Sequence, residues 1–178
     1  MDVPQQLAPH LLTVDTADRM RQLGRDLAGL LRPGDLVLLS GELGAGKTTL
    51  TRGLGEGLDV RGSVASPTFV IARVHPPLGS GPGLVHVDAY RLEGGLDEME
   101  DLDLELSLPR SVVVVEWGEG KVEGLADSRL EVRIERSAGS ALASQAPPEG
   151  EEVAEDPRTV RLTAVGPAWH DRSLSPLG

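Results

Sequence analysis

Residues 41 to 48 read Gly41-Glu42-Leu43-Gly44-Ala45-Gly46-Lys47-Thr48, a match to the pattern G-x-x-x-x-G-K-[ST] at every fixed position. A short apolar run, residues 35–40, precedes this stretch, and residues 49–54 can start a helix. A phosphate-binding P-loop requires this order of strand, glycine-rich loop and helix. The stretch therefore predicts a site for the phosphates of a nucleotide.

Each residue type in the loop suits a chemical task. Glycines let the backbone turn its N–H groups toward phosphate oxygens, and the following helix points its positive end at the same anion. Lys47 can reach the outer phosphates, and the Thr48 hydroxyl can bind Mg²⁺. Lys47 and Lys121 are the two lysines of the chain, so a chance lysine here is not expected. The predicted nucleotide-binding residues of the loop are Gly41, Glu42, Leu43, Gly44, Ala45, Gly46, Lys47, Thr48 and Thr49.

Length and composition exclude several classes of protein. The 178 residues suit one domain with a hydrophobic core, so we expect residues 1–178 to form a single P-loop domain. A net charge of -11 and the lack of a Lys/Arg run disfavour direct binding to tRNA or DNA. Without cysteine there is no disulfide, thiolate nucleophile or cysteine metal site. No secretion signal or membrane-spanning stretch is recognisable, which leads us to expect a soluble cytoplasmic protein.

The hydrophobic pattern predicts alternating helices and strands. Apolar residues recur at helical spacing between Thr13 and Leu31, with Thr16 as the expected N-cap. The helix after the P-loop is expected to fade near Gly55 and Gly57. Strands are expected at residues 69–74, 84–88, 111–117, 129–135 and 159–165. The four valines at 112–115 suit a strand buried on both faces, whereas the alternation in 129–135 and 159–165 suits half-exposed strands, with 129–135 near an edge.

These elements predict an α/β fold, namely a P-loop NTPase-like three-layer sandwich. Its central sheet is expected to be mixed and mainly parallel, with antiparallel strands toward the C-terminus. Residues 96–106 are acidic and are expected to form a solvated helix face or a docking surface for a basic partner. Residues 137–157 are rich in Ala, Ser, Pro and Glu without apolar periodicity, which predicts a disordered insertion inside a hairpin.

Two acids complete the predicted active site. Asp88 and Glu116 each end an apolar strand, and in open α/β sheets ligands gather at the carboxyl ends of the strands. Asp88 is assigned to holding Mg²⁺ directly or through water, and Glu116 to orienting or deprotonating the attacking water, with metal contact as a competing role. A strand-end carboxylate can also cap a neighbouring helix or be solvated. The predicted catalytic residues are thus Lys47, Asp88 and Glu116, and the predicted metal ligands are Thr48, Asp88 and Glu116.

Four further side chains have a functional and a structural interpretation. Thr68, in a loop after the P-loop helix, can sense the γ-phosphate or serve as an ordinary turn residue. Trp117 can stack on the base or a partner, or fill the core. For Arg91 an ion pair with the acidic stretch is favoured over a phosphate contact, and His86 is expected to be a packed core histidine.

Four segments in order resemble the TsaE (YjeE) family of bacterial P-loop ATPases over about residues 16–135. They are Gly41 to Thr49, Ser66-Pro67-Thr68-Phe69, His86-Val87-Asp88-Ala89-Tyr90-Arg91-Leu92 and Val115-Glu116-Trp117-Gly118-Glu119. The set is much more specific than the P-loop alone. The chain departs from the family pattern in residues 137–157 and in its extended C-terminus, which leaves the pairing of the last strand open.

The resemblance implies an ATPase that uses ATP and Mg²⁺ and works with the proteins TsaD and TsaB. Together they install threonylcarbamoyl on a tRNA adenosine beside the anticodon, and ATP turnover resets the TsaD-TsaB complex. It also implies phosphate binding by residues 41–48, Mg²⁺ ligation by Thr48, essential acids at Asp88 and Glu116, a switch-like segment around Thr68, and a family tryptophan at Trp117. Contact with tRNA would be indirect, through the complex.

Two alternatives differ from this ATPase. A small-molecule kinase also uses a P-loop but usually carries an arginine-rich lid, and the region after Arg91 is acidic instead. A non-catalytic module would use nucleotide only to shape a partner surface. A GTPase is disfavoured because the chain contains no Asn-Lys-x-Asp segment.

Overall fold

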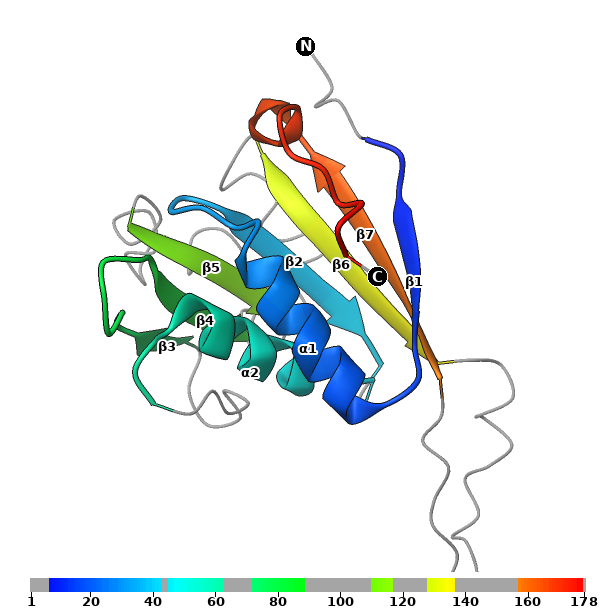
Figure 1. Cartoon of the computed structure of the whole chain (residues 1–178), viewed down its shortest axis with the longest axis horizontal. Coiled ribbons are helices and arrows are strands. Elements are labelled where there is room, and N and C mark those ends of the chain that lie inside the picture. The colour runs from blue at the N-terminus through cyan, green and yellow to red at the C-terminus, as the bar shows by residue number, and fades with distance from the viewer. Residues whose placement is uncertain are drawn as a thin grey trace, which may run out of the picture.

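We describe the protein from a computed structural model, which describes residues 7–42, 45–62, 72–88, 110–116, 128–136 and 157–177. These residues form one seven-stranded sheet and two α-helices (Figure 1). The strands are β1 (His10–Val14), β2 (Leu36–Gly41), β3 (Ala72–His75), β4 (Gly83–Asp88), β5 (Ser111–Glu116), β6 (Arg129–Arg136) and β7 (Arg158–Val165). The helices are α1 (Ala17–Ala28) and α2 (Lys47–Leu58), and a short 3-10 helix spans Pro167–Trp169.

The sheet is mixed, with the strand order β1-β7-β6-β2-β5-β4-β3. Its four central strands, β6, β2, β5 and β4, are parallel, while β7, β1 and β3 join antiparallel at the two sides. This arrangement confirms the predicted α/β class with antiparallel C-terminal strands. Because parallel strands end at the same edge, the carboxyl ends of β2, β4, β5 and β6 all lie along one edge of the sheet.

The edge strand β1 was not predicted. It pairs antiparallel with β7 along all five residues, and α1 then begins after the N-cap Thr16, whose Oγ1 accepts the Arg19 N–H at 3.1 Å. The predicted cap is therefore confirmed, although the helix starts later than Thr13. Strand β6 pairs with β2 on one side and with β7 on the other, and β1 lies outside β7, so the expectation that residues 129–135 lie near an edge was wrong. A strand of five residues has too little pattern to be recognised without its partner.

The central strands are buried on both faces, as the valine run predicts. Val112 and Val114 belong to the core cluster beneath the helices, whereas Val113 and Val115 alternate to the opposite face. All four are at most 1% exposed. Both described helices lie on one face of the sheet (Figure 1).

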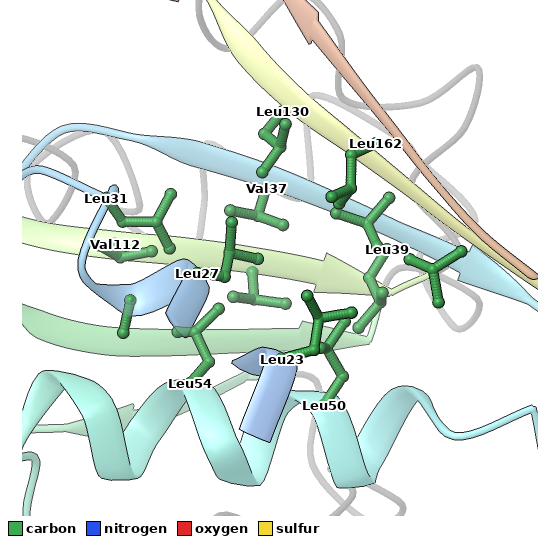
Figure 2. Close-up of a cluster of buried hydrophobic side chains, with 14 of the residues drawn as sticks. Leu23, Leu27, Leu31, Val37, Leu39, Leu50, Leu54, Val112, Leu130 and Leu162 are labelled. Carbon is green, nitrogen blue, oxygen red and sulfur yellow. The ribbon is translucent and has the colours of Figure 1, made fainter. Parts of the chain in front are cut away.

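The two helices cross unusually closely because glycines lie at their contact. A Cβ added to Gly53 would come 1.9 Å from the Arg21 carbonyl oxygen, and one on Gly24 would come 2.2 Å from the Leu50 carbonyl oxygen. Helix α2 continues through Gly55 and Gly57 and ends at Leu58, next to the region where the sequence predicted that it would fade. Close packing offsets the conformational cost of glycine in a helix. Figure 2 shows the leucines of both helices facing the sheet residues Val37, Leu39, Val112, Leu130 and Leu162.

Glu56 ties the two helices together at the surface. Its carboxylate accepts hydrogen bonds from the guanidinium groups of Arg21 and Arg25, with a distance of 2.7 Å from Arg25 Nε to Glu56 Oε2. The bond from Arg21 is the main cause that lowers the pKa of Glu56 to about 2. Both arginines lie on α1 and Glu56 on α2, so the pairing fixes the helices side by side.

The C-terminal residues after β7 return to the core. Trp169 and Leu177 are 1% and 2% exposed and belong to the hydrophobic cluster. Arg172 stacks over the Trp169 ring at 4.4 Å and donates to Asp35 just before β2, with 3.0 Å from Nη2 to Oδ1. The pairing of β7, which the sequence left open, is antiparallel to β6 over eight residues.

Several predicted features lie outside the described residues. These are Thr68, residues 69–71 of the strand expected at 69–74, Arg91, the acidic stretch 96–106, Trp117 and residues 137–156 of the expected insertion. In the described part of the chain, we find no helix with the length and apolar character needed to cross a membrane.

Candidate nucleotide-binding and active site

The predicted P-loop joins β2 to α2 at the carboxyl edge of the sheet. Strand β2 ends at Gly41, and α2 begins at Lys47 with Gly46 as its N-cap. The N-cap residue Gly46 provides no side-chain cap for this helix start. The first N–H groups of a helix lack partners within the helix and carry its positive dipole end. The start of α2 therefore offers the donors and the field that suit a phosphate.

Two glycines of the loop are required by geometry. Gly46 has a φ of 112°, a conformation that side chains with a Cβ rarely adopt. A Cβ on Gly41 would lie 2.7 Å from the Ile134 carbonyl oxygen of the neighbouring strand β6. Geometry therefore explains why the pattern has glycine at both ends of the loop. Leu43 and Gly44 lie outside the described residues.

Lys47 folds back over the loop that precedes it. Its Nζ donates to the carbonyl oxygens of Gly41 at 2.7 Å and Glu42 at 3.0 Å. Burial lowers the pKa of the Lys47 ammonium, while the carboxylates of Glu116 and Asp88 act in the opposite direction. The ammonium is therefore held at the loop and within electrostatic reach of both predicted acids. Thr48 and Thr49 follow in the first turn of α2 and are half-buried.

Asp88 and Glu116 are brought together by the register of the sheet. Strands β4 and β5 are parallel, and Asp88 pairs directly with Glu116 at their last residues. Glu116 also pairs with Leu39 of β2, so it occupies the strand next to the P-loop strand. Paired residues share a face, and Leu39 belongs to the core cluster beneath α1 and α2. The two acids consequently lie on the same face of the sheet as the P-loop helix.

His86 proved to be more than a packed core residue. It is buried as expected, at 0% exposure, but its Nε2 lies 3.3 Å from Glu116 Oε1. Among the described residues, neither ring nitrogen of His86 nor Glu116 Oε1 forms a hydrogen bond of normal geometry. The alternation His86-Val87-Asp88 contained a signal for this position, because residues two apart in a strand share a face.

The donor set suits Mg²⁺ rather than a closed protein-only metal site. Over the described ranges no cluster of three or more His, Asp or Glu side chains is placed to hold a metal. Two neighbouring carboxylates and the hydroxyl of Thr48 are hard oxygen donors, and Mg²⁺ in nucleotide sites keeps waters and substrate phosphates as its other ligands. Buried Glu116 Oε1, without a normal hydrogen bond from the described residues, fits such a cation.

The fold and the site together define an α/β P-loop protein that binds nucleotides. A model of the family described as "Threonylcarbamoyl adenosine biosynthesis protein TsaE" matches residues 14–143. The chain therefore belongs to the TsaE family, as the four motif segments indicated.

Similar proteins agree with this assignment. A Streptomyces coelicolor protein named "tRNA threonylcarbamoyladenosine biosynthesis protein TsaE" is 65% identical over 89% of this chain and 99% of its own length. The Bacillus subtilis protein of the same name is 37% identical over 84% of this chain and 82% of its own. The crystal structure of Bacillus subtilis YdiB matches with a TM-score of 0.62 at 29% identity, covering 93% of this chain and 90% of that one.

Proposed function

We propose that this chain is the ATP-binding and ATP-hydrolysing subunit of the bacterial complex that adds threonylcarbamoyl to the tRNA adenosine next to the anticodon. In this proposal ATP turnover resets a complex of TsaD-like and TsaB-like proteins between cycles. Family membership supports the tRNA-modification role. The observation that supports hydrolysis is the meeting of three charged groups, Lys47, Asp88 and Glu116, at one edge of the sheet.

The chain's own residues would divide the work. Backbone N–H groups of residues 41–48 and the Lys47 ammonium bind and orient the phosphates, and Thr49 adds to the binding residues. The Glu116 carboxylate accepts a hydrogen bond from a water and aligns its oxygen with the γ-phosphorus. As the new O–P bond forms, the water gives a proton to the Glu116 carboxylate, and the bond from the γ-phosphorus to the β–γ bridging oxygen breaks, releasing ADP and phosphate. Lys47 stabilises the negative charge on the phosphate oxygens.

Thr48, Asp88 and Glu116 would hold Mg²⁺, which neutralises charge on the β- and γ-phosphates when bound. Thr68 and Trp117 keep their predicted roles at the γ-phosphate and the base or partner. The net charge of -11 supports tRNA contact through the partners rather than through this chain. A role in tRNA modification also supports a cytoplasmic location.

The proposal is tested by measuring two activities in a reconstituted system. Phosphate release from Mg²⁺·ATP and threonylcarbamoyl-tRNA formation are followed with purified partners, for the wild type, Glu116→Gln and the control Glu135→Gln. Glu135 is an exposed acid on β6, paired with Arg133. We expect slow ATP hydrolysis by the chain alone that the partners change, and loss of both activities in Glu116→Gln only.

Two outcomes contradict the proposal. Transfer of the γ-phosphate to a small acceptor identifies a kinase instead. Sustained tRNA modification by Glu116→Gln, with hydrolysis abolished, identifies a module in which nucleotide binding alone is needed.

A further inference from the structure

A side chain from the far end of the chain contacts the P-loop. Arg158 begins β7, and its Nε donates to the carbonyl oxygen of Ala45 at 3.2 Å across a sequence separation of 113 residues. Arg158 lies beyond residues 14–143, which the family model matches. None of the motif segments includes it.

The position of Arg158 in the sheet makes this contact specific. Val160, Leu162 and Ala164 of β7 face the helix-side core, and Arg158 shares their face by alternation. Its register partner in β6 is a second arginine, Arg136. The bond from Arg158 to Ala45 therefore links the first residue of β7 directly to the P-loop.

The contact has a consequence for the phosphate site because of peptide geometry. A trans peptide unit is planar, and its C=O and the following N–H point in opposite directions. When Arg158 holds the Ala45 carbonyl toward β7, the Gly46 N–H is turned to the other side. That N–H belongs to the donors at the start of α2 that lack a partner within the helix.

Cations hold three of the loop carbonyls that the structure describes, and the carbonyl of Gly46 accepts the Leu50 N–H within α2. Lys47 binds the carbonyl oxygens of Gly41 and Glu42, and Arg158 binds that of Ala45. Carbonyl oxygens repel phosphate, whereas N–H groups attract it. Holding the carbonyls back therefore pre-organises the loop for an anion.

We propose that Arg158 is a positioning residue for nucleotide binding, which acts through its Nε–H on the Ala45 carbonyl to aim the Gly46 N–H at a phosphate. The inference depends on the proposed function, since it assumes that a nucleotide polyphosphate occupies the loop. It assigns Arg158 no contact with the nucleotide.

Two uncharged substitutions separate this role from a simple charge effect. In Arg158→Gln the amide Nε2 occupies the same place along the side chain as the arginine Nε, so the donor remains while the charge is lost. Arg158→Met has a methyl group at that place and loses both. Arg161→Met, on the opposite face of the same strand and exposed, is the matched control.

Three quantities are measured for each variant. They are the Kd for an ATP analogue in the presence of Mg²⁺, the Tm, and the NMR chemical shift of the Gly46 amide in the free protein. We expect Arg158→Met to raise Kd about tenfold and to shift the Gly46 amide, because a Gly46 N–H that is no longer aimed at the phosphate loses a hydrogen bond to a charged group. The Kd of Arg158→Gln should stay within about threefold of the wild-type value, and the Kd of Arg161→Met should equal the wild-type value. If Arg158→Met does not fold, Arg158→Ala replaces it.

Equal weakening by Arg158→Gln and Arg158→Met would overturn the inference in favour of a charge effect. Unchanged binding in Arg158→Met, or a lower Tm with unchanged Kd, would overturn it in favour of a structural role. Failure of the wild type to bind the analogue would instead refute the proposed function, so the two failures are distinguishable.

Discussion

A charged side chain is buried at each end of the strand pair β2 and β5, but the two side chains differ in how well their hydrogen bonds are satisfied. At the start of β2, Asp35 accepts two hydrogen bonds from Arg172 and one from the Arg32 N–H at 2.6 Å. At the end of β5, Glu116 is equally buried, yet its Oε1 has only the 3.3 Å approach of His86 among the described residues.

This difference separates stability from function. A buried ion pair with satisfied hydrogen bonds is well fixed in position, and removal of one partner strongly lowers the stability of the protein. A buried carboxylate that lacks such bonds costs stability unless a ligand supplies them, which is the arrangement expected of an active site. We therefore assign the Asp35–Arg172 pair to fixing the C-terminal tail and the Glu116 end to chemistry.

The largest expected effect is on hydrolysis at the Glu116 end. Glu116→Gln keeps the size of the side chain but cannot accept a proton or orient water as well, so the partner-supported ATPase rate should fall by about 10²–10⁴-fold. The Tm should not fall, because a poorly satisfied buried carboxylate is removed. Steady-state phosphate release and calorimetry check both parts, and a large drop in Tm with unchanged turnover would reverse the comparison.

At the opposite end the effect should fall on stability alone. Arg172→Met leaves Asp35 buried without its partner, so we expect a loss of about 3–5 kcal/mol in the free energy of unfolding. Nucleotide affinity should be unchanged where the variant is folded. The control is Arg32→Met, which removes an exposed pair with Asp171 and should leave the free energy of unfolding almost unchanged. Urea unfolding measures the free energy of unfolding of both variants. Similar losses in Arg172→Met and Arg32→Met would contradict the account.

A smaller effect is expected where the helices cross. Alanine normally stabilises a helix relative to glycine, but the Cβ in Gly53→Ala would collide with the Arg21 backbone. We expect a net loss of about 1–3 kcal/mol from overpacking. Gly79→Ala, where nothing lies within 4 Å of an added Cβ, is the control. A stabilised Gly53→Ala variant in urea unfolding would show that the close crossing is not as described.

The smallest effect concerns the exposed link between the helices. Because its pKa falls from 4.5 to about 2 on folding, ionised Glu56 stabilises the protein above pH 4.5. This contribution is lost as the pH falls toward about 2. Glu56→Gln should therefore flatten the fall of stability over this interval, and about 1 M salt should shrink the difference from the wild type. Parallel pH curves for the two proteins would contradict the assignment.

Much of the fold was predictable because local patterns were strong. The valine run, the alternation in β6 and β7 and the Thr16 cap each carried a distinct periodicity or signature. Strand β1 was missed because its stability comes from a distant partner, β7. Trp169 and Arg172 likewise acquire their roles only through contacts with residues far earlier in the chain.

The site shows the same division. The P-loop was predictable because its residues are consecutive, and strand ends indicated Asp88 and Glu116. Their direct pairing depends on the register of β4 and β5, which no local pattern sets. The approach of His86 to Glu116 follows from that register, and the contact of Arg158 with Ala45 spans most of the chain.

The central claim is that the loop and the acids around Lys47 bind a nucleoside triphosphate. Isothermal titration of Mg²⁺ and a non-hydrolysable ATP analogue into the wild type and Lys47→Met tests it directly. The account predicts binding by the wild type and a loss of at least about tenfold in affinity for Lys47→Met, since a charged contact to phosphate is removed. Absence of binding to the wild type, or equal affinity in both proteins, would contradict it.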